Sequence, residues 1–296
     1  MLLRHRLGVK PALRHSENID RLISVTLSLG VIGLGRMAQA LLLPLLEQGT
    51  PSADEVIAVV GQAATVTRLA SELPAELTLL AASDPQALSA WRAPMQLLAI
   101  KPYQLDQVAA AAPPVHDESS PLLISVLAGI TLERLQSSFP GRVCVRAVPN
   151  TPSLVRAGLT GLAWGQGVTE AQKLQVQALF SPVSEVLELP EERLDAFLAL
   201  TSSGPAYVAM IAEAMADGAV AVGMPRDQAQ HLAHRTLAGT AALLHEQKLH
   251  PAQLKDMVAS PGGTTMAAIR RLEAAGLRSS LIEAVVAAAE HGRSLR

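Results

Sequence analysis

GVIGLGRMAQALL, residues 30–42, leads from an apolar run into the start of a helix-like segment. It fits the pattern G-x-G-x-x-A, with Gly33, Gly35 and Ala38 in the motif positions. In such a turn the first glycine permits the tight bend, the second lets the backbone approach a pyrophosphate, and the small third residue lets the helix pack on the strand. The free amides of residues 34–37 would face the phosphates, aided by the helix dipole. The stretch therefore predicts a dinucleotide-binding turn, with a glycine-rich turn that binds no ligand as the alternative.

The sequence around this turn alternates short apolar runs with helix-like segments from about residue 24 to residue 190. The apolar runs are bounded by glycine or proline, as strands buried on both faces should be; they are SLGVIGLG, EVIAVVG, MQLLAIKP, PLLISVLAG and RVCVRAVP. Helix-like stretches such as residues 37–48 and 131–137 lie between them. The alternation predicts an α/β fold in which helices cover both faces of a Rossmann-like parallel sheet.

After Pro190 the strand-like runs stop, and residues 191–296 are expected to form an all-helical domain, with helix starts at SSGPAY, MPRDQA and HPAQLKD. The expected helix over residues 206–222 is apolar on most faces, more than a small domain would cover, so a homo-oligomer is predicted. In residues 1–23, four Lys or Arg residues precede the first acid, Glu17. We interpret this segment as a disordered extension, with a transit-like segment as the alternative.

The composition excludes several classes of protein. A net charge of -2 over 296 residues provides no basic field for nucleic acid or an acidic membrane surface. Charged residues and glycines interrupt every long apolar run, so no membrane span is expected. The single cysteine, Cys144, rules out an intrachain disulfide and favours a reducing compartment, here the cytoplasm. Cys144 lies in a predicted buried strand and is expected to pack rather than react.

The second predicted strand, EVIAVV, bears on the choice of cofactor. An NAD site usually places an acid at the end of this strand for the ribose hydroxyls. Here the strand is followed by Gly61 and Gln62, while Asp54 and Glu55 stand at its other end. The missing carboxylate removes the repulsion that would exclude a 2′-phosphate. NADPH is therefore the expected cofactor, with NADH as the alternative.

A second glycine-bearing loop, SPGGTT at residues 260–265, precedes another helix-like segment. A small acid at this helix start could accept hydrogen bonds from successive backbone amides, which Gly262 and Gly263 keep free of side chains. Ser260 and Thr265 add hydroxyls that can donate and accept. The loop thus predicts a carboxylate site. The alternative is a helix cap in which Thr264 or Thr265 bonds its own helix.

HPAQLKDMVASPGGTTMAAIRRLEAAGLRSSLIEAV, residues 250–285, resembles the signature segment of the pyrroline-5-carboxylate reductase family. The cofactor turn and four further segments are similar to that family in the same order: LLAIKPYQLDQV, ISVLAGIT, VRAVPNTPSLVRAG and LTSSGPAYVAMIAEAMADGAVAVGMPR. The likeness covers about residues 29–291. It implies an NAD(P)H-dependent enzyme that reduces 1-pyrroline-5-carboxylate to L-proline, the last step of proline biosynthesis. It also implies a Rossmann-like domain over residues 24–190 and a helical domain over 191–296 that binds substrate and interlocks two subunits, in dimers that can assemble further.

By matching position, the resemblance also implies site residues. The substrate carboxylate would be held by Ser260, Gly262, Gly263, Thr264 and Thr265, and the Thr265 hydroxyl would contact the ring nitrogen as the catalytic group. The cofactor contacts would be Gly33, Leu34, Gly35, Arg36, Met37, Ala38, Ala99, Ile100, Lys101, Pro102, Ala128, Gly129 and Asn150. No metal is expected, and the pair His231 and His234 is interpreted as a solvated helix face.

Two rival functions remain. A β-hydroxyacid dehydrogenase would share a turn like GLGRMA, but it places a catalytic lysine in the helical domain, where Lys248 and Lys255 match no such motif. A silent NADP(H)-binding redox sensor would keep Gly33, Gly35 and Ala38 without needing SPGGTT. Cofactor binding without consumption in the presence of pyrroline-5-carboxylate would favour the sensor.

Overall fold

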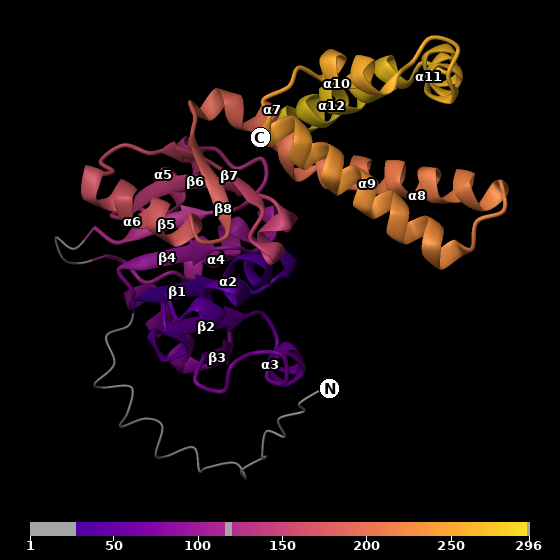
Figure 1. The fold of residues 1–296 in the computed structure, drawn as a ribbon. Helices are drawn as coiled ribbons and strands as arrows, with labels where there is room; N and C mark the ends of the chain where they lie inside the picture. Colours follow the sequence, from indigo (N-terminus) through magenta and orange to yellow (C-terminus); the bar gives the residue numbers. More distant parts are fainter. Residues whose placement is uncertain (1–27, 116–119, 295–296) are drawn as a thin grey trace.

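The computed structural model of the chain describes residues 28–115 and 120–294. The expected N-terminal extension, residues 1–23, lies outside the described residues. Figure 1 shows a sheet with helices packed on it, from which a group of helices projects. All strands lie between Leu29 and Glu188, and only helices follow as far as residue 294. The predicted fold class is confirmed.

Eight strands form one sheet in the order β3-β2-β1-β4-β5-β6-β7-β8. They are β1 (Leu29–Ile32), β2 (Val56–Val60), β3 (Thr78–Ala81), β4 (Met95–Leu98), β5 (Leu122–Ser125), β6 (Val143–Pro149), β7 (Gly158–Trp164) and β8 (Ser184–Glu188). Every pair is parallel except β6 with β7, which is antiparallel. The five predicted strands are β1, β2, β4, β5 and β6, the buried parallel part of the sheet.

The sequence analysis missed β3, β7 and β8. Two of them, β3 and β8, are edge strands with partly exposed side chains, so they lack the continuous apolar run that identified the others. Strand β7 contains Gly158 and Gly161, which read as loop residues. A Cβ at Gly161 would lie 2.9 Å from Cδ1 of Phe197, so this glycine admits a packed helix. The connection from β6 to β7, residues 150–157, is too short for the crossover that a parallel pair needs, so β7 runs antiparallel to β6.

Alternate side chains of the strands supply two cores, one on each face of the sheet. Val31 and Val145 join one cluster with residues of α2 (Arg36–Gln48) and α6 (Glu170–Phe180). Ile32 and Cys144 join the other with residues of α4 (Leu105–Ala111) and α5 (Leu132–Ser138). The remaining short helices of this half are α3 (Ala63–Leu69), η1 (Ala53–Glu55), η2 (Pro85–Arg92), η3 (Pro102–Gln104) and η4 (Thr151–Val155).

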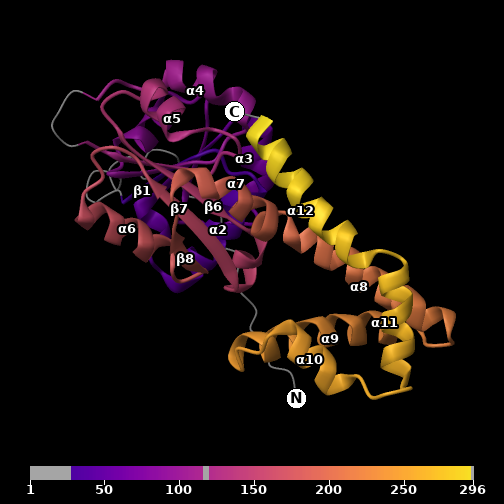
Figure 2. The same cartoon turned by 90° about the horizontal axis from the view of Figure 1, so that it is seen from above.

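The helical half begins with η5 (Glu191–Arg193), α7 (Leu194–Phe197) and the π-helical turn η6 (Leu198–Ser202). It continues with α8 (Gly204–Ala221), α9 (Arg226–Glu246), α10 (Pro251–Val258), α11 (Thr264–Ala274) and α12 (Leu277–Ser294). We call the hairpin of α8 and α9 the helical arm. Figures 1 and 2 show the arm extending away from the sheet, while α12 runs back toward it and packs on α7 and η6.

Small side chains hold the arm together: Ala216, Ala229 and Ala233 are buried between its helices. The outer positions are apolar but uncovered, including Val208, Met210 and Val222. By length and composition, the helical segment Glu191–Ala221 could cross a membrane. Of its most apolar 18-residue stretch, 17% is buried inside the protein. One such helix is weak evidence for a span, and its exposed apolar side chains fit a protein interface equally well.

Cys144 lies on β6 with no exposed surface. Burial raises the pKa of its thiol to about 11, against a smaller lowering by the nearby Arg142. The thiol should therefore fail to react with a soluble disulfide reagent at neutral pH until the protein unfolds.

The raised pKa of Cys144 also predicts a pH dependence of stability. Between about pH 9 and about pH 11 the Cys144 thiol is ionised in the unfolded chain but still protonated in the folded protein. The free energy of unfolding therefore falls by about 2 to 3 kcal/mol as the pH rises through this range. Urea unfolding at several alkaline pH values measures this fall. In Cys144→Ala that part of the fall should be absent; equal slopes in both proteins would contradict the prediction.

Candidate functional site

The carboxyl ends of β1, β2, β4, β5 and β6 meet at one edge of the sheet, because these strands are parallel. Backbone hydrogen bonds tie the segments that follow them together. The Gly33 amide donates to the Val59 carbonyl at 2.8 Å, and the Ala99 amide donates to the Ile32 carbonyl at 2.8 Å. In open α/β sheets the crevice outside this edge is where ligands bind, at the point where the strand order reverses. Here the reversal lies between β1 and β4, at the predicted cofactor turn.

Gly33 is required by the local backbone. Its φ is +93°, and a Cβ there would lie 2.7 Å from the Ala99 carbonyl oxygen. Gly35 differs, since its φ of -76° suits any residue and, its chain neighbours aside, no atom of the described residues lies within 4 Å of where a Cβ would be. The protein itself therefore leaves open the space that a side chain at Gly35 would occupy. A ligand that approaches the backbone closely gives this glycine a purpose.

The N-terminus of α2 is free to bind an anion. Gly35 is its N-cap residue, no side chain caps it, and no acid lies in its first turn. The Gln39 side chain instead donates to the Leu34 carbonyl at 2.9 Å, which fixes the turn beneath the helix start. The first amides of a helix lack intrahelical acceptors, so those after Gly35 are available to a phosphate. These residues fit a dinucleotide.

The other predicted cofactor residues lie at the same edge, and one of them, Asn150, is buried. Ala99, Ile100, Lys101 and Pro102 follow β4, and Ala128 and Gly129 follow β5. Asn150 follows β6 but is only 4% exposed. Its amide nitrogen donates to the Thr201 carbonyl at 3.0 Å, and its amide oxygen accepts from the Leu159 amide at 2.8 Å. Both ends of the amide therefore bond within the protein, which gives this side chain a structural role, and its contact with the cofactor stays a prediction.

The end of β2 is as the sequence predicted. Asp54 and Glu55 belong to η1, which precedes the strand, and Gly61 and Gln62 follow it, both exposed. No carboxylate therefore stands directly after β2.

The loop SPGGTT forms the N-terminus of α11. Gly262 has φ +70°, and the Gly263 amide donates to the Ser260 carbonyl at 3.0 Å. Gly263 is the N-cap residue, and no side chain caps the helix. A Cβ at Gly263 would lie 2.5 Å from the Ser260 hydroxyl oxygen, so the glycine lets that hydroxyl lie beside the helix start. The alternative in which Thr264 or Thr265 caps the helix is wrong, and the amides of α11 remain available to an anion.

Within one chain the two open helix starts lie apart. Figures 1 and 2 place α10 and α11 away from the sheet, beyond the end of α12 that packs on α7. Among the described residues, no group of three His, Cys, Asp or Glu side chains is placed to bind a metal. The start of α2, on the sheet, and the start of α11 are therefore separated within this chain.

The chain is similar to proteins of one enzyme family. Residues 191–295 match the family model described as pyrroline-5-carboxylate reductase dimerisation. A pyrroline-5-carboxylate reductase of Synechocystis sp. is 43% identical over 271 residues, which are 92% of this chain and 99% of the relative. The chain belongs to the pyrroline-5-carboxylate reductase family. The reductase of Mycobacterium leprae is 37% identical, over 93% of this chain and 99% of its own.

Structures and a second family model agree with membership of this reductase family. The reductase of Coxiella burnetii has 29% identity and a TM-score of 0.76, covering 91% of this chain and 98% of its own. That of Streptococcus pyogenes has 26% identity and a TM-score of 0.80, covering 90% and 98%. Residues 28–129 match the model described as NADP oxidoreductase, coenzyme F420-dependent. The dimerisation segment of the reductase family coincides with the exposed apolar helices, which supports the predicted homo-oligomer.

Sequence reasoning missed one feature of the site's surroundings. The side chain of Arg146, within β6, has no exposed surface and forms ion pairs with Glu191 and Asp195. The signal was a charged residue inside an otherwise apolar strand, since such a charge must find a partner when buried. Its partners could not be chosen from the sequence.

Proposed function

We propose that this protein reduces 1-pyrroline-5-carboxylate to L-proline with NADPH, with NADH as the less favoured cofactor, in the last step of proline biosynthesis. The observation that carries the proposal is the pair of uncapped, glycine-bearing helix starts in a chain of this reductase family. One is suited to a diphosphate and the other to a small carboxylate. We further propose that the domains divide near residue 190 and that the enzyme is cytoplasmic.

The cofactor half of the site comprises the edge of the sheet. Backbone amides of Leu34, Arg36, Met37 and Ala38, with the open backbone of Gly33 and Gly35, would hold the diphosphate. The segments Ala99–Pro102 and Ala128–Gly129 would border the rest of the dinucleotide, since they lie at the same edge. Gly61 and Gln62 leave room for a 2′-phosphate, and no acid there opposes NADPH.

The substrate half is the start of α11. The amides of Gly263, Thr264 and Thr265 and the hydroxyl of Ser260 would bind the substrate carboxylate, while Gly262 supplies the left-handed turn that exposes those amides. The Thr265 hydroxyl would contact the ring nitrogen. Hydrogen bonds to a charged acceptor are the strong kind, so this loop can fix one end of a small acid.

The reaction needs positioning more than acid–base groups. A reduced nicotinamide bound at the start of α2 would supply the hydride that reduces the C=N bond at the imine carbon. The ring nitrogen takes a proton from solvent, because a cyclic imine is basic enough to be protonated in water. The protein's part is to orient the substrate carboxylate and nitrogen, which converts a bimolecular encounter into a step between held groups.

Thr265→Ala should lower kcat about tenfold, a cost of about 1.4 kcal/mol, because the ring nitrogen loses the hydroxyl that orients it. Steady-state kinetics with pyrroline-5-carboxylate and NADPH measure the change. Thr265→Ser keeps the hydroxyl and should remain near the wild-type rate. An unchanged kcat in Thr265→Ala would remove this residue from the mechanism.

We propose that two chains interlock through their helical halves, so that the α11 start of one chain completes the cofactor site of its partner. The separation of the two helix starts within one chain supports this arrangement. A dimer then contains two shared sites, and such dimers can assemble further.

Mixed dimers test the shared site. One chain carries Gly35→Asp and the other Gly263→Asp, each placing a carboxylate where an anion should bind. A hybrid dimer with shared sites has one site that combines both defects and one that has none, so random re-association should restore about a quarter of the wild-type activity. Sites built within single chains would give no recovery, which would contradict the interlocked dimer.

The function itself is tested by nicotinamide absorbance, with pyrroline-5-carboxylate and each reduced cofactor in turn. Consumption of NADPH with formation of proline is the expected result. Binding of NADPH without consumption would favour the redox sensor instead.

A further inference from the structure

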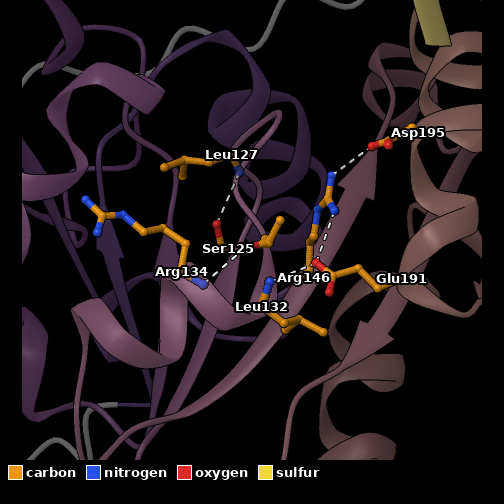
Figure 3. A network of polar contacts seen from close by, with 8 residues as sticks. Ser125, Leu127, Leu132, Arg134, Arg146, Glu191 and Asp195 are labelled. Carbon is orange, nitrogen blue, oxygen red and sulfur yellow. Dashed lines mark hydrogen bonds and ion pairs between the residues drawn. The ribbon is translucent and has the colours of Figure 1, made fainter. Parts of the chain in front are cut away.

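The carboxyl-terminal half of β6 is bonded to the segment that leads into the helical arm. Arg146 donates through Nη1 to Glu191 Oε1 at 3.1 Å and through Nη2 to Asp195 Oδ1 at 3.3 Å. Figure 3 shows the guanidinium of Arg146 between these two carboxylates. Glu191 Oε1 also accepts from the Leu132 amide at 2.7 Å, so that α5 joins the same cluster. These contacts fix η5 and α7 to the sheet.

Four residues further along, the end of β6 is bonded to η6. The Asn150 amide nitrogen donates to the Thr201 carbonyl, and the Ser202 hydroxyl donates to the Pro149 carbonyl at 3.1 Å. The Asn150 amide oxygen accepts from the Leu159 amide of β7. One buried side chain therefore joins three elements, two in the sheet and one in the helical half.

The turn that receives these bonds leads directly into the arm. Residues Leu198–Ser202 form a π-helical turn, in which the Ser203 amide donates to the Leu198 carbonyl, and α8 begins at Gly204. Single π-turns are uncommon and recur at functional sites. The direction in which α8 leaves the sheet is thus set at residues that β6 holds, on the strand end that also borders the cofactor edge.

We propose that Asn150, with Arg146, is a positioning residue that fixes the angle between the sheet and the helical arm. This inference rests on the proposed function. Because each site takes its cofactor half from one chain and its α11 start from another, the angle of the arm decides how far the two helix starts lie apart. A loosened junction should therefore disturb the meeting of substrate with cofactor while leaving the cofactor turn itself intact.

Asn150→Asp removes the bond to the arm and places a carboxylate oxygen, in place of the N–H, against the Thr201 carbonyl. The carboxylate keeps an oxygen that accepts from the Leu159 amide, but it has no N–H to donate to the Thr201 carbonyl. We expect kcat/KM for pyrroline-5-carboxylate to fall about tenfold, because orientation of the reacting groups is lost. The Kd for NADPH, measured by fluorescence titration, should stay within about twofold of wild type, because the α2 start is unchanged.

Ser184→Ala is the matched control. Ser184 is buried, and its hydroxyl bonds only to that of Ser153 among the described residues, within the sheet half. This variant should lower Tm as a lost buried hydrogen bond does, yet leave kcat/KM unchanged. If the control loses as much kcat/KM as Asn150→Asp at equal loss of Tm, Asn150 acts through stability alone and the proposal is overturned.

A distance measurement tests the junction without relying on activity. Spin labels at Ala110→Cys on α4 and Gln228→Cys on α9 span the sheet and the arm, both at exposed positions. The buried Cys144 does not compete for the label. Labelled chains are diluted with unlabelled chains, so that each oligomer carries one label pair.

Two outcomes separate this inference from the proposed function. A broader or shifted distance distribution in Asn150→Asp than in wild type and Ser184→Ala supports the junction, whereas identical distributions overturn it. If the wild-type protein does not reduce pyrroline-5-carboxylate at all, the proposed function fails, and the distances still decide whether Asn150 sets the angle of the arm.

Discussion

Gly35→Asp should abolish NADPH binding without unfolding the protein. The backbone at Gly35 has φ -76°, which any residue adopts, and nothing in the described part of the chain beyond its two neighbours lies within 4 Å of a Cβ there. Aspartate is also a good N-cap residue and interacts favourably with the helix dipole, so α2 should be as stable as before or more so. Its carboxylate would lie where the diphosphate binds, and repulsion should raise the Kd for NADPH at least about 100-fold, or about 2.7 kcal/mol.

Gly35→Asn is the matched control for charge. Asparagine has the same size and caps a helix equally well, so the difference in Kd between the two variants measures repulsion alone. Fluorescence titration gives the Kd, and urea unfolding shows whether either fold is weakened. Equal affinities in the two variants would mean that no diphosphate lies at this helix start.

Gly263→Asp should raise the KM for pyrroline-5-carboxylate about 100-fold while the Kd for NADPH stays unchanged. Gly263 has φ -77° and is the N-cap residue of α11, so aspartate fits the backbone and caps the helix. The new Cβ would displace the Ser260 hydroxyl, which is the free end of a small side chain. It would also lie 3.1 Å from the Ser260 carbonyl oxygen, a close contact. The added carboxylate then opposes the carboxylate of the substrate.

Gly263→Asn again separates charge from size. It should raise KM far less than Gly263→Asp, since it displaces the same hydroxyl without adding charge. Steady-state kinetics at saturating NADPH measure both variants. If the two variants show the same KM, the α11 start does not hold the substrate carboxylate, whatever the fate of the cofactor site.

Gly33 responds differently from Gly35, although the motif treats both as glycine positions. Gly33→Ala would combine a left-handed φ of +93° with a contact of 2.7 Å to the Ala99 carbonyl, so it should damage the fold as well as the site. The distinction is invisible in the motif because it depends on β4, a strand about sixty residues away along the chain. Only the packed sheet shows which glycine serves the backbone and which serves the ligand.

Patterns of neighbouring residues predicted a large part of the fold. Strands β1, β2, β4, β5 and β6 were identifiable because strands buried on both faces are continuously apolar. Edge strands β3 and β8 were not, because most of their side chains are only partly buried or exposed. Asn150 shows the same limit at the site: the family resemblance implied a cofactor contact, and only the structure shows its buried bonds to Leu159 and Thr201.

The sequence by itself determined the two glycine-bearing helix starts, because turn, cap and strand signals are local and lie within a few residues of each other. Tertiary structure alone decided that these helix starts lie apart in one chain and that Arg146 and Asn150 join the sheet to the helical half. The contacts of Arg146 and Asn150 with the helical half join residues 45 to 51 positions apart, and they depend on buried polar groups that accept whichever partner the packing brings near. No local pattern encodes that choice.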